Sequence, residues 1–219
     1  MTNKRPLGLP SARLILIAAL AGLMAGAVAV YVRNAGSGNA ELAGAAGACE
    51  GTAEIARKVD ELAKGEVAAM ASASPPRPVQ LSFKGPEGQD LKTADFAGKT
   101  VLLNLWATWC GPCREEMPAL NNLQKDMGDE DFEVVAVNID TGSDEKPKTF
   151  LSETGVDALG YYRDSSMGVF NTMKKEGLAF GLPVTLILDR QGCLVSAMNG
   201  PAAWDSPDAK ALIAAAKSR

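Results

Sequence analysis

Strands and helices alternate in the hydrophobic pattern of the last two thirds of the chain. Residues 100–106 and 132–139 are nearly continuous apolar and β-branched runs, typical of strands covered on both faces of a parallel sheet. Between them, residues 114–127 carry apolar side chains at helical spacing. A strand, a helix and a second strand in this order indicate an α/β fold.

Shorter signals surround this unit. Residues 79–83 and 89–91, separated by a Gly-Pro-Glu-Gly turn, predict a β-hairpin. Residues 184–188 and 194–198 predict a later antiparallel pair, and residues 204–217 predict a closing helix.

The N-terminal region contains an apolar stretch without charges, residues 14–32, which would form about 28 Å of helix and could span a bilayer. Basic residues are concentrated before it, so we expect residues 1–13 in the cytoplasm. The chain would then cross the inner membrane once, with the domain that follows in the periplasm.

Two alternatives to a retained anchor stay open. The small-x-small triplet 27–29 could be a signal-peptidase site, although it lies inside the apolar stretch rather than after it. Cys49 could be the acylated residue of a lipoprotein, although it lies well beyond that stretch and Ala46 stands three residues before it.

Three segments are expected between the anchor and the end of the chain. Residues 33–48, rich in Ala and Gly, predict a flexible periplasmic linker. Residues 49–73 predict a helix packed on the main domain, capped by Thr52 and apolar on one face as far as Met70. Clustered prolines then mark the start of the main domain, residues 75–219.

Composition narrows the possible functions. The chain is 47% apolar, which is enough for one core, and its net charge of −4 comes without a Lys/Arg run that would favour nucleic acid. It contains no histidine and four cysteines. Cysteine–histidine proteases and imidazole-based metal sites are therefore excluded, and we expect neither a metal nor a cofactor.

The candidate chemistry is a pair of cysteines, Cys110 and Cys113, in the sequence Trp-Cys-Gly-Pro-Cys-Arg. Both fall at the start of the helix that follows the first buried strand. Unpaired N–H groups and the helix dipole there favour a thiolate. We expect Cys110, with its sulfur exposed, to attack a substrate disulfide and Cys113 to resolve the mixed intermediate. A static disulfide or half of a zinc site is the alternative.

Several segments together resemble the TlpA/ResA-like, membrane-anchored branch of the thioredoxin superfamily. They are Asn-Leu-Trp-Ala-Thr-Trp-Cys-Gly-Pro-Cys at 104–113, Asp-Phe-Ala-Gly-Lys at 95–99, Glu-Met-Pro at 116–118 and Gly-Leu-Pro-Val-Thr at 181–185. The resemblance implies a thioredoxin-like fold with a central mixed sheet flanked by helices and an N-terminal hairpin extension.

The same resemblance accounts for the long connection before Pro183. Residues 148–153, 160–162 and 165–175 predict a helix, a short strand and a helix. They resemble the βα insertion of the TlpA-like branch.

Further site residues are implied by the family pattern. Pro183 would be a cis proline facing the cysteines, and the backbone of Leu182 would pair with substrate. Gly111 and Pro112 match the reducing members of the superfamily. Trp109 would be an exposed apolar flank against which substrate docks.

Proton handling is expected to differ from that of thioredoxin itself. Thioredoxins have a buried aspartate where this chain has Asn104, which cannot accept a proton. Glu116 matches the acidic residue of the TlpA/ResA-like group and would accept the proton of Cys113. The alternative is that Glu115 and Glu116 only complement the helix dipole.

The two remaining cysteines, Cys49 and Cys193, are expected to form a structural disulfide, because leftover thiols in an extracytoplasmic protein tend to pair. Two buried free thiols are the alternative.

The sequence thus predicts a monomeric, membrane-tethered periplasmic reductant of protein disulfides. Resemblance suggests copper-delivery proteins of cytochrome oxidase assembly as substrates, with apocytochromes c as the alternative. A transmembrane thiol-electron donor would reduce the protein. A thiol peroxidase is a further alternative, but the Pro-x-x-x-Thr/Ser-x-x-Cys context is missing before Cys110.

Overall fold

The structure, a computed structural model, describes residues 49–218. The expected cytoplasmic segment 1–13, anchor 14–32 with its alternative cleavage site, and linker 33–48 lie outside the described residues. Within residues 49–218, the helices are too short or too polar to cross a bilayer. Residues 45–219 cluster into one compact unit.

The centre of the fold is a set of long, buried strands. Strand β4 (Thr100–Trp106) pairs in parallel with β5 (Phe132–Asn138) and antiparallel with β7 (Val184–Leu188). Strand β7 continues antiparallel into β8 (Leu194–Asn199). Every residue of β4 and β7 is buried, which explains their continuous apolar pattern.

Shorter strands complete an eight-stranded mixed sheet in the order β1-β8-β7-β4-β5-β6-β2-β3. Strand β6 (Tyr162–Arg163) runs parallel to β5 and antiparallel to β2 (Ser82–Lys84), which forms the expected hairpin with β3 (Asp90–Lys92). Strand β1 (Ala71–Ser72) pairs with β8 at the opposite edge.

The segment that contains β1 follows β8 along most of its length. Beyond β1, the N–H of Ala73 donates to Val195, the N–H of Leu194 donates to Arg77, and the N–H of Val79 donates to Gly192. Residues 71–79 therefore cover the backbone edge that β8 would otherwise leave unpaired.

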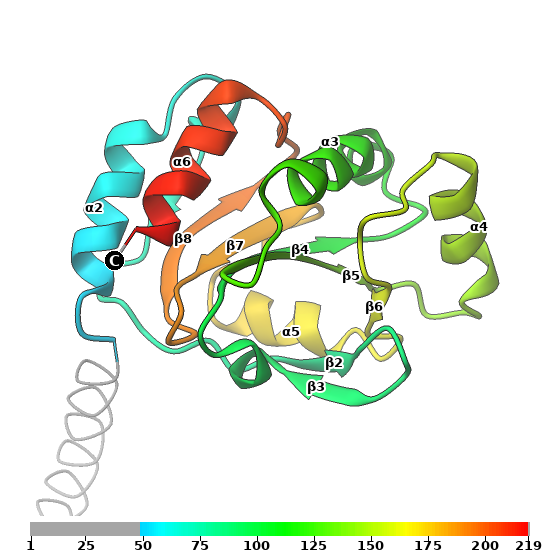
Figure 1. Cartoon of the computed structure of the whole chain (residues 1–219). Helices are drawn as coiled ribbons and strands as arrows, with labels where there is room; N and C mark the ends of the chain where they lie inside the picture. The colour runs from blue at the N-terminus through cyan, green and yellow to red at the C-terminus, as the bar shows by residue number, and fades with distance from the viewer. Residues whose placement is uncertain (1–48, 219) are drawn as a thin grey trace, which may run out of the picture. The chain divides into compact units, whose positions relative to one another are not determined.

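Helices cover the sheet on both faces (Figure 1). Helix α3 (Gly111–Met127) lies over one face and α5 (Gly168–Lys175) lies over the other. Helix α2 (Thr52–Leu62) packs beside α6 (Pro207–Lys217), and α4 (Glu145–Glu153) lies in the connection between β5 and β6. The expected hairpin extension and the expected helix-strand-helix connection are both present.

The N-terminal helix is shorter than the sequence suggested. Helix α2 ends at Leu62, and the chain turns at Gly65, whose φ is 55°, into a short 3₁₀ helix, Gly65–Val67. Thr52 does not cap the helix, because its hydroxyl donates to Asp189 Oδ2 at 2.5 Å instead. The apolar spacing continues to Met70, but the backbone leaves the helical conformation at Ala63, where ψ is 83°.

Helices α6 and α5 also begin later in the chain than the sequence predicted. The closing helix begins at Pro207 rather than Trp204, because Ser206 Oγ accepts the N–H of Ala209 and caps it. Likewise α5 begins at Gly168 rather than at residue 165.

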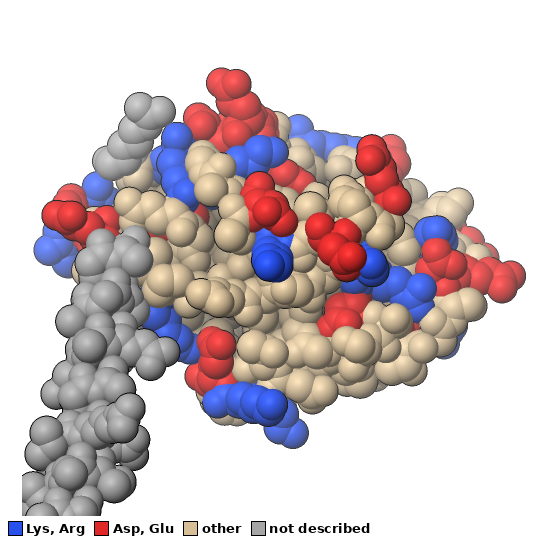
Figure 2. Space-filling model, turned by 90° about the horizontal axis from the view of Figure 1, so that it is seen from below, with Lys and Arg blue, Asp and Glu red and all other residues tan. Residues whose placement is uncertain are grey.

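Charged side chains are distributed over the surface without separating by sign on the face that Figure 2 shows. There, acidic and basic side chains of the described residues lie interspersed. Among the described residues, ion pairs such as Lys99–Glu133 (2.8 Å) and Lys84–Asp90 (2.7 Å) join opposite charges. The mixed charge gives the face in Figure 2 little long-range attraction for a polyanion or polycation.

Candidate active site

Cys110 and Cys113 form a disulfide at the N-terminus of α3, with an S–S distance of 2.00 Å and a Cα–Cα distance of 5.3 Å. Cys110 is the N-cap residue of the helix. The N–H of Cys113 donates to Cys110 Sγ at 3.2 Å, and Pro112 follows in the first turn, where no N–H is needed. After reduction the same N–H and the helix dipole would favour a thiolate at Cys110.

The sulfur of Cys110 is less accessible than the sequence analysis expected. Cys110 is only 6% exposed and Cys113 is fully buried, whereas Gly111 and Pro112 are exposed. In this disulfide form Cys110 is therefore a buried residue, whereas the sequence predicted an exposed first sulfur. The difference between the two cysteines still leaves Cys110 as the one that a partner can reach.

Trp109 and Trp106 are placed as expected. Trp109 is 61% exposed beside the disulfide, whereas Trp106, at the end of β4, is buried in the core at 1% exposed. The apolar surface next to Cys110 is therefore provided by Trp109.

Sequence analysis missed the residue that fixes the turn before Cys110. Asp140 Oδ2 accepts the N–H of Thr108 at 2.9 Å, and its Oδ1 accepts the Thr108 hydroxyl at 2.9 Å. Asn138 Nδ2 also donates to Asp140 Oδ2, at 2.7 Å. The signal in the sequence was the polar pair Asn138 and Asp140 at the end of a buried strand, because the ends of parallel neighbouring strands meet at one edge of the sheet.

The strand register brings Pro183 to the same edge. Leu105 of β4 pairs with Val184 of β7, so Pro183 lies beside the end of the strand that leads to Cys110. The Leu182–Pro183 peptide bond is cis, and the N–H of Gly200 donates to the Pro183 carbonyl at 2.9 Å. Leu182 is half-buried.

Glu116 lies on α3, three residues after Cys113, and is 3% exposed. Its Oε1 accepts Asn104 Nδ2 at 2.8 Å. Its Oε2 accepts two donors from the connection between β8 and α6, the N–H of Ala202 at 3.1 Å and Trp204 Nε1 at 3.0 Å. Partners that are distant in sequence therefore fix the orientation of this carboxyl group, which the helix alone would not do.

Burial raises the pKa of Glu116 from 4.5 to about 7, while the hydrogen bonds from Asn104, Ala202 and Trp204 oppose the rise. A carboxyl group with this pKa can accept and release a proton near neutral pH. Glu115 is exposed and lacks this environment. Complementing the helix dipole does not account for the burial of Glu116.

Asn104 links Glu116 to the strand that carries Pro183. Its Nδ2 donates to Thr185 Oγ1 at 3.0 Å as well as to Glu116. Its Oδ1 is buried and has no hydrogen-bond partner among the described residues. Rotation of the amide by half a turn would present this oxygen to Glu116, as a protonated carboxyl group would require.

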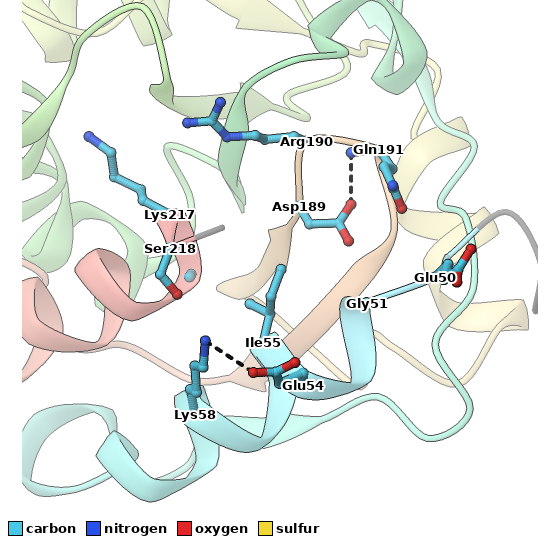
Figure 3. A pocket seen from close by; sticks show the side chains of 11 residues that line it. Glu50, Gly51, Glu54, Ile55, Lys58, Asp189, Arg190, Gln191, Lys217 and Ser218 are labelled. Carbon is cyan, nitrogen blue, oxygen red and sulfur yellow. Dashed lines mark hydrogen bonds and ion pairs between the residues drawn. The ribbon is translucent and has the colours of Figure 1, made fainter.

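The expected pairing of Cys49 with Cys193 is present, with a Cα–Cα distance of 5.7 Å. It joins the start of α2 to the turn between β7 and β8. Beside it lies a hollow of about 270 Å³ (Figure 3). Its three basic side chains already have partners, which are Glu54 for Lys58, Asp131 for Arg190 and Asp129 for Lys217. Cys110 and Cys113 are not among the residues that line the hollow.

Within residues 49–218, the acidic and cysteine side chains form no cluster of three or more that could hold a metal ion. The described chemistry is that of the cysteine pair and the buried carboxyl group.

The model of the Redoxin family matches residues 49–213. The chain belongs to the Redoxin family. Among curated relatives of this Redoxin-family chain, the thioredoxin-like protein YneN of Bacillus subtilis is 37% identical over 119 residues, 52% of this chain and 64% of YneN. The thiol-disulfide oxidoreductase ResA of Bacillus anthracis is 31% identical over 114 residues, 52% of this chain and 62% of ResA. The alignments span less than two thirds of these relatives.

Solved structures agree on the fold of this Redoxin-family chain. A thiol:disulfide interchange protein DsbE from Chlorobium tepidum aligns with a TM-score of 0.55 and 28% identity, over 64% of this chain and 94% of that one. A DsbF homologue from Corynebacterium diphtheriae aligns with a TM-score of 0.51 and 26% identity, over 63% and 88%. The predicted thioredoxin-like fold and the resemblance to the TlpA/ResA-like branch are confirmed.

Proposed function

We propose that this protein is a thiol:disulfide oxidoreductase that reduces the disulfides of other proteins. The observation that carries the proposal is the Cys110–Cys113 disulfide at the start of α3, beside the cis-Pro183 loop. Support also comes from relatives named thiol-disulfide oxidoreductase and from membership of the Redoxin family.

The reaction begins with the reduced pair. The Cys110 thiolate attacks one sulfur of the foreign disulfide, which breaks that S–S bond, forms a mixed disulfide and releases the other sulfur as a thiolate that takes up a proton. The Cys113 thiolate then attacks Cys110 Sγ and releases the second substrate thiol. Two electrons pass to the substrate, and the protein is left with the Cys110–Cys113 disulfide.

Glu116 is the proposed acceptor of the Cys113 proton. Its pKa of about 7 places it between the carboxylate and the acid under neutral conditions. It is buried on the same helix, three residues after the buried Cys113, which supports this role.

The proposed location is the inner membrane, with a single span at residues 14–32 and the redox domain in the periplasm. The uncharged apolar stretch and the basic residues before it support this arrangement. Because the periplasm is oxidising, the proposal includes a transmembrane thiol-electron donor that keeps the cysteine pair reduced.

The proposed substrates are copper-delivery proteins of cytochrome oxidase assembly, whose cysteines must be reduced before they bind metal. Resemblance to the TlpA-like branch supports this choice. Apocytochromes c, before haem attachment, are the second candidate.

Trapping tests both the reaction and the substrate. In Cys113→Ser, the mixed disulfide with Cys110 cannot be resolved, so the variant should carry its substrate covalently into mass spectrometry. We expect copper-delivery proteins in the trapped fraction, and apocytochromes c would support the second candidate. Cys110→Ser is the control and should trap nothing. Equal recovery from both variants would contradict thiol exchange, and rapid peroxide consumption by the reduced protein would indicate a thiol peroxidase.

A further inference from the structure

Two large hydrophobic side chains are exposed within residues 49–218, Trp109 at 61% and Phe180 at 82%. Trp109 precedes Cys110 directly, and Phe180 lies three residues before Pro183. Single exposed apolar residues are common on proteins. Here, however, each of them lies in a segment next to the redox disulfide, Trp109 in the turn before Cys110 and Phe180 in the loop before Pro183.

The strand register places the two aromatic residues at one end of the sheet. Strand β4 runs toward that end and leads through Trp109 to Cys110. Strand β7 is antiparallel to β4 and starts there, directly after the loop that carries Phe180, with Val184 opposite Leu105. Trp109 and Phe180 therefore approach the disulfide from two different segments.

The loop that carries Phe180 is fastened by one side chain. Asn199, the last residue of β8, accepts the N–H of Phe180 at its Oδ1 (2.8 Å) and donates from Nδ2 to the Leu178 carbonyl (2.9 Å). Ala179, between these two residues, is buried at 1% exposed. The backbone that leads into Phe180 is thus held while its ring is left in solvent, as in a preorganised binding contact.

We propose that Phe180 is a docking residue for the polypeptide that carries the substrate disulfide, acting across the cysteine pair from Trp109. The occupant is a disulfide-bearing polypeptide with apolar side chains next to its cystine. Because Cys110 is only 6% exposed, a protein disulfide that reaches it must bring its own neighbouring residues against the surface around it. This inference rests on the proposed function and extends it to substrate recognition.

Buried aromatic side chains contribute a large part of the binding energy at protein interfaces. A small disulfide does not extend to Phe180, whereas a folded or unfolded polypeptide does. Loss of the ring should therefore discriminate between these two kinds of substrate.

The test uses the full chain, reduced beforehand and freed of reductant, in single-turnover reactions with insulin and with hydroxyethyl disulfide. The measured quantity is the ratio of the two second-order rate constants, insulin over hydroxyethyl disulfide. We expect Phe180→Ser to lower this ratio about tenfold. Phe180→Tyr, which keeps an apolar ring, should stay within about twofold of wild type. Lys174→Ala, an exposed change on the neighbouring helix α5, is the matched surface control and should keep both rates.

An unchanged ratio in Phe180→Ser would overturn the proposal, as would a wild-type protein that reduces hydroxyethyl disulfide but not insulin. A Phe180→Ser variant that changes sedimentation behaviour rather than the ratio would assign the ring to contact with a second copy. If the wild-type protein reduces neither probe, the proposed function itself fails. Phe180→Leu and a circular dichroism spectrum of each variant separate lost docking from lost folding.

Discussion

At the scale of single residues, the carboxyl group of Glu116 is subject to opposing effects. Burial favours its protonated form, and three hydrogen-bond donors favour its carboxylate. Because burial is the larger effect, the folded chain binds this proton more tightly than the unfolded chain does. The associated stabilisation is complete below pH about 4.5 and is lost as the pH rises through about 7.

Glu116→Gln should remove this pH dependence. For the wild-type protein we expect the free energy of unfolding to fall by on the order of 3 kcal/mol between pH 4.5 and pH 8 through this group. The Gln variant should fold, because the Asn104 amide can turn its unpartnered Oδ1 toward the new NH₂ group. Denaturant unfolding across this pH range measures the effect, and the pH profile of Cys113 alkylation should change with it. Parallel curves for the two proteins would contradict the assignment.

Asn104→Asp should place two buried carboxyl groups in contact, since Asn104 Nδ2 lies 2.8 Å from Glu116 Oε1. The pair would share a proton and titrate in two steps, the upper one above the pKa of about 7 of Glu116. We expect a loss of roughly 2–3 kcal/mol of stability at pH 8 and a smaller loss at pH 5. Denaturant unfolding at both pH values measures this difference.

Asn122→Asp is the matched control for that variant. Asn122 Nδ2 also lies 2.8 Å from a carboxylate, Asp205 Oδ2, but at the surface. Its replacement should change stability by less than about 0.5 kcal/mol. Similar losses from the two variants would mean that burial is not the cause.

Local spacing in the sequence indicated the cysteine pair, the family resemblance added Glu116 and Pro183, and Asp140 and Asn199 were not predicted. Cys110, Cys113 and Glu116 follow one another along one helix, so a motif contains them. Asp140 and Asn199 act on segments that are near in space but far along the chain. Only the strand register brings them to the site, and one sequence does not supply that register.

At the scale of elements, helix α2 is attached to the rest of the fold by three kinds of contact. It packs along α6, Thr52 donates to the buried Asp189, and Cys49 is bonded to Cys193. The hydrogen bond and the disulfide both end at the turn between β7 and β8. This turn therefore fixes the start of the helix.

Cys49→Ser/Cys193→Ser should destabilise the protein without changing its chemistry. The disulfide closes a loop with a sequence separation of 144, so its removal should cost about 2–5 kcal/mol. The guanidinium midpoint should fall, while the rate of exchange with hydroxyethyl disulfide stays the same. Loss of exchange in a folded variant would contradict a purely structural role.

Cys110→Ser/Cys113→Ser is the control, because that disulfide closes a loop with a sequence separation of only 3 and should stabilise the fold much less. In the denatured, unreduced state this variant should show no reactive thiol. Two reactive thiols would mean that Cys49 and Cys193 are unpaired.

The long buried strands were predictable, and the N-terminal helix was only partly so. Strands β4 and β5 are buried on both faces, so their apolar runs are enough to predict them as strands. Residues 63–73 keep apolar side chains at helical spacing, but they pack as a 3₁₀ turn and as an added edge strand. Pairing with β8 makes residues 71–72 a strand, and the hydrophobic periodicity of the sequence does not show this pairing.

At the scale of the whole molecule, residues 45–219 form one compact unit. A chain that begins at Ala45 should therefore unfold with a free energy within about 0.5 kcal/mol of the full chain and reduce hydroxyethyl disulfide at the same rate. Denaturant unfolding and single-turnover kinetics of the two chains measure this. A large loss of stability would mean that the first 44 residues contribute to the core.

The strands at the two margins of the sheet are short. Strand β3 has three residues, two of them charged, and residues 71–79 run along β8 at the other margin. Edge strands with unpaired backbone groups can pair with strands of other chains and form continuous sheets and fibrils. A chain that lacked residues 71–79 would present six residues of β8 in this way. Residues 71–79 thus also protect the protein against aggregation.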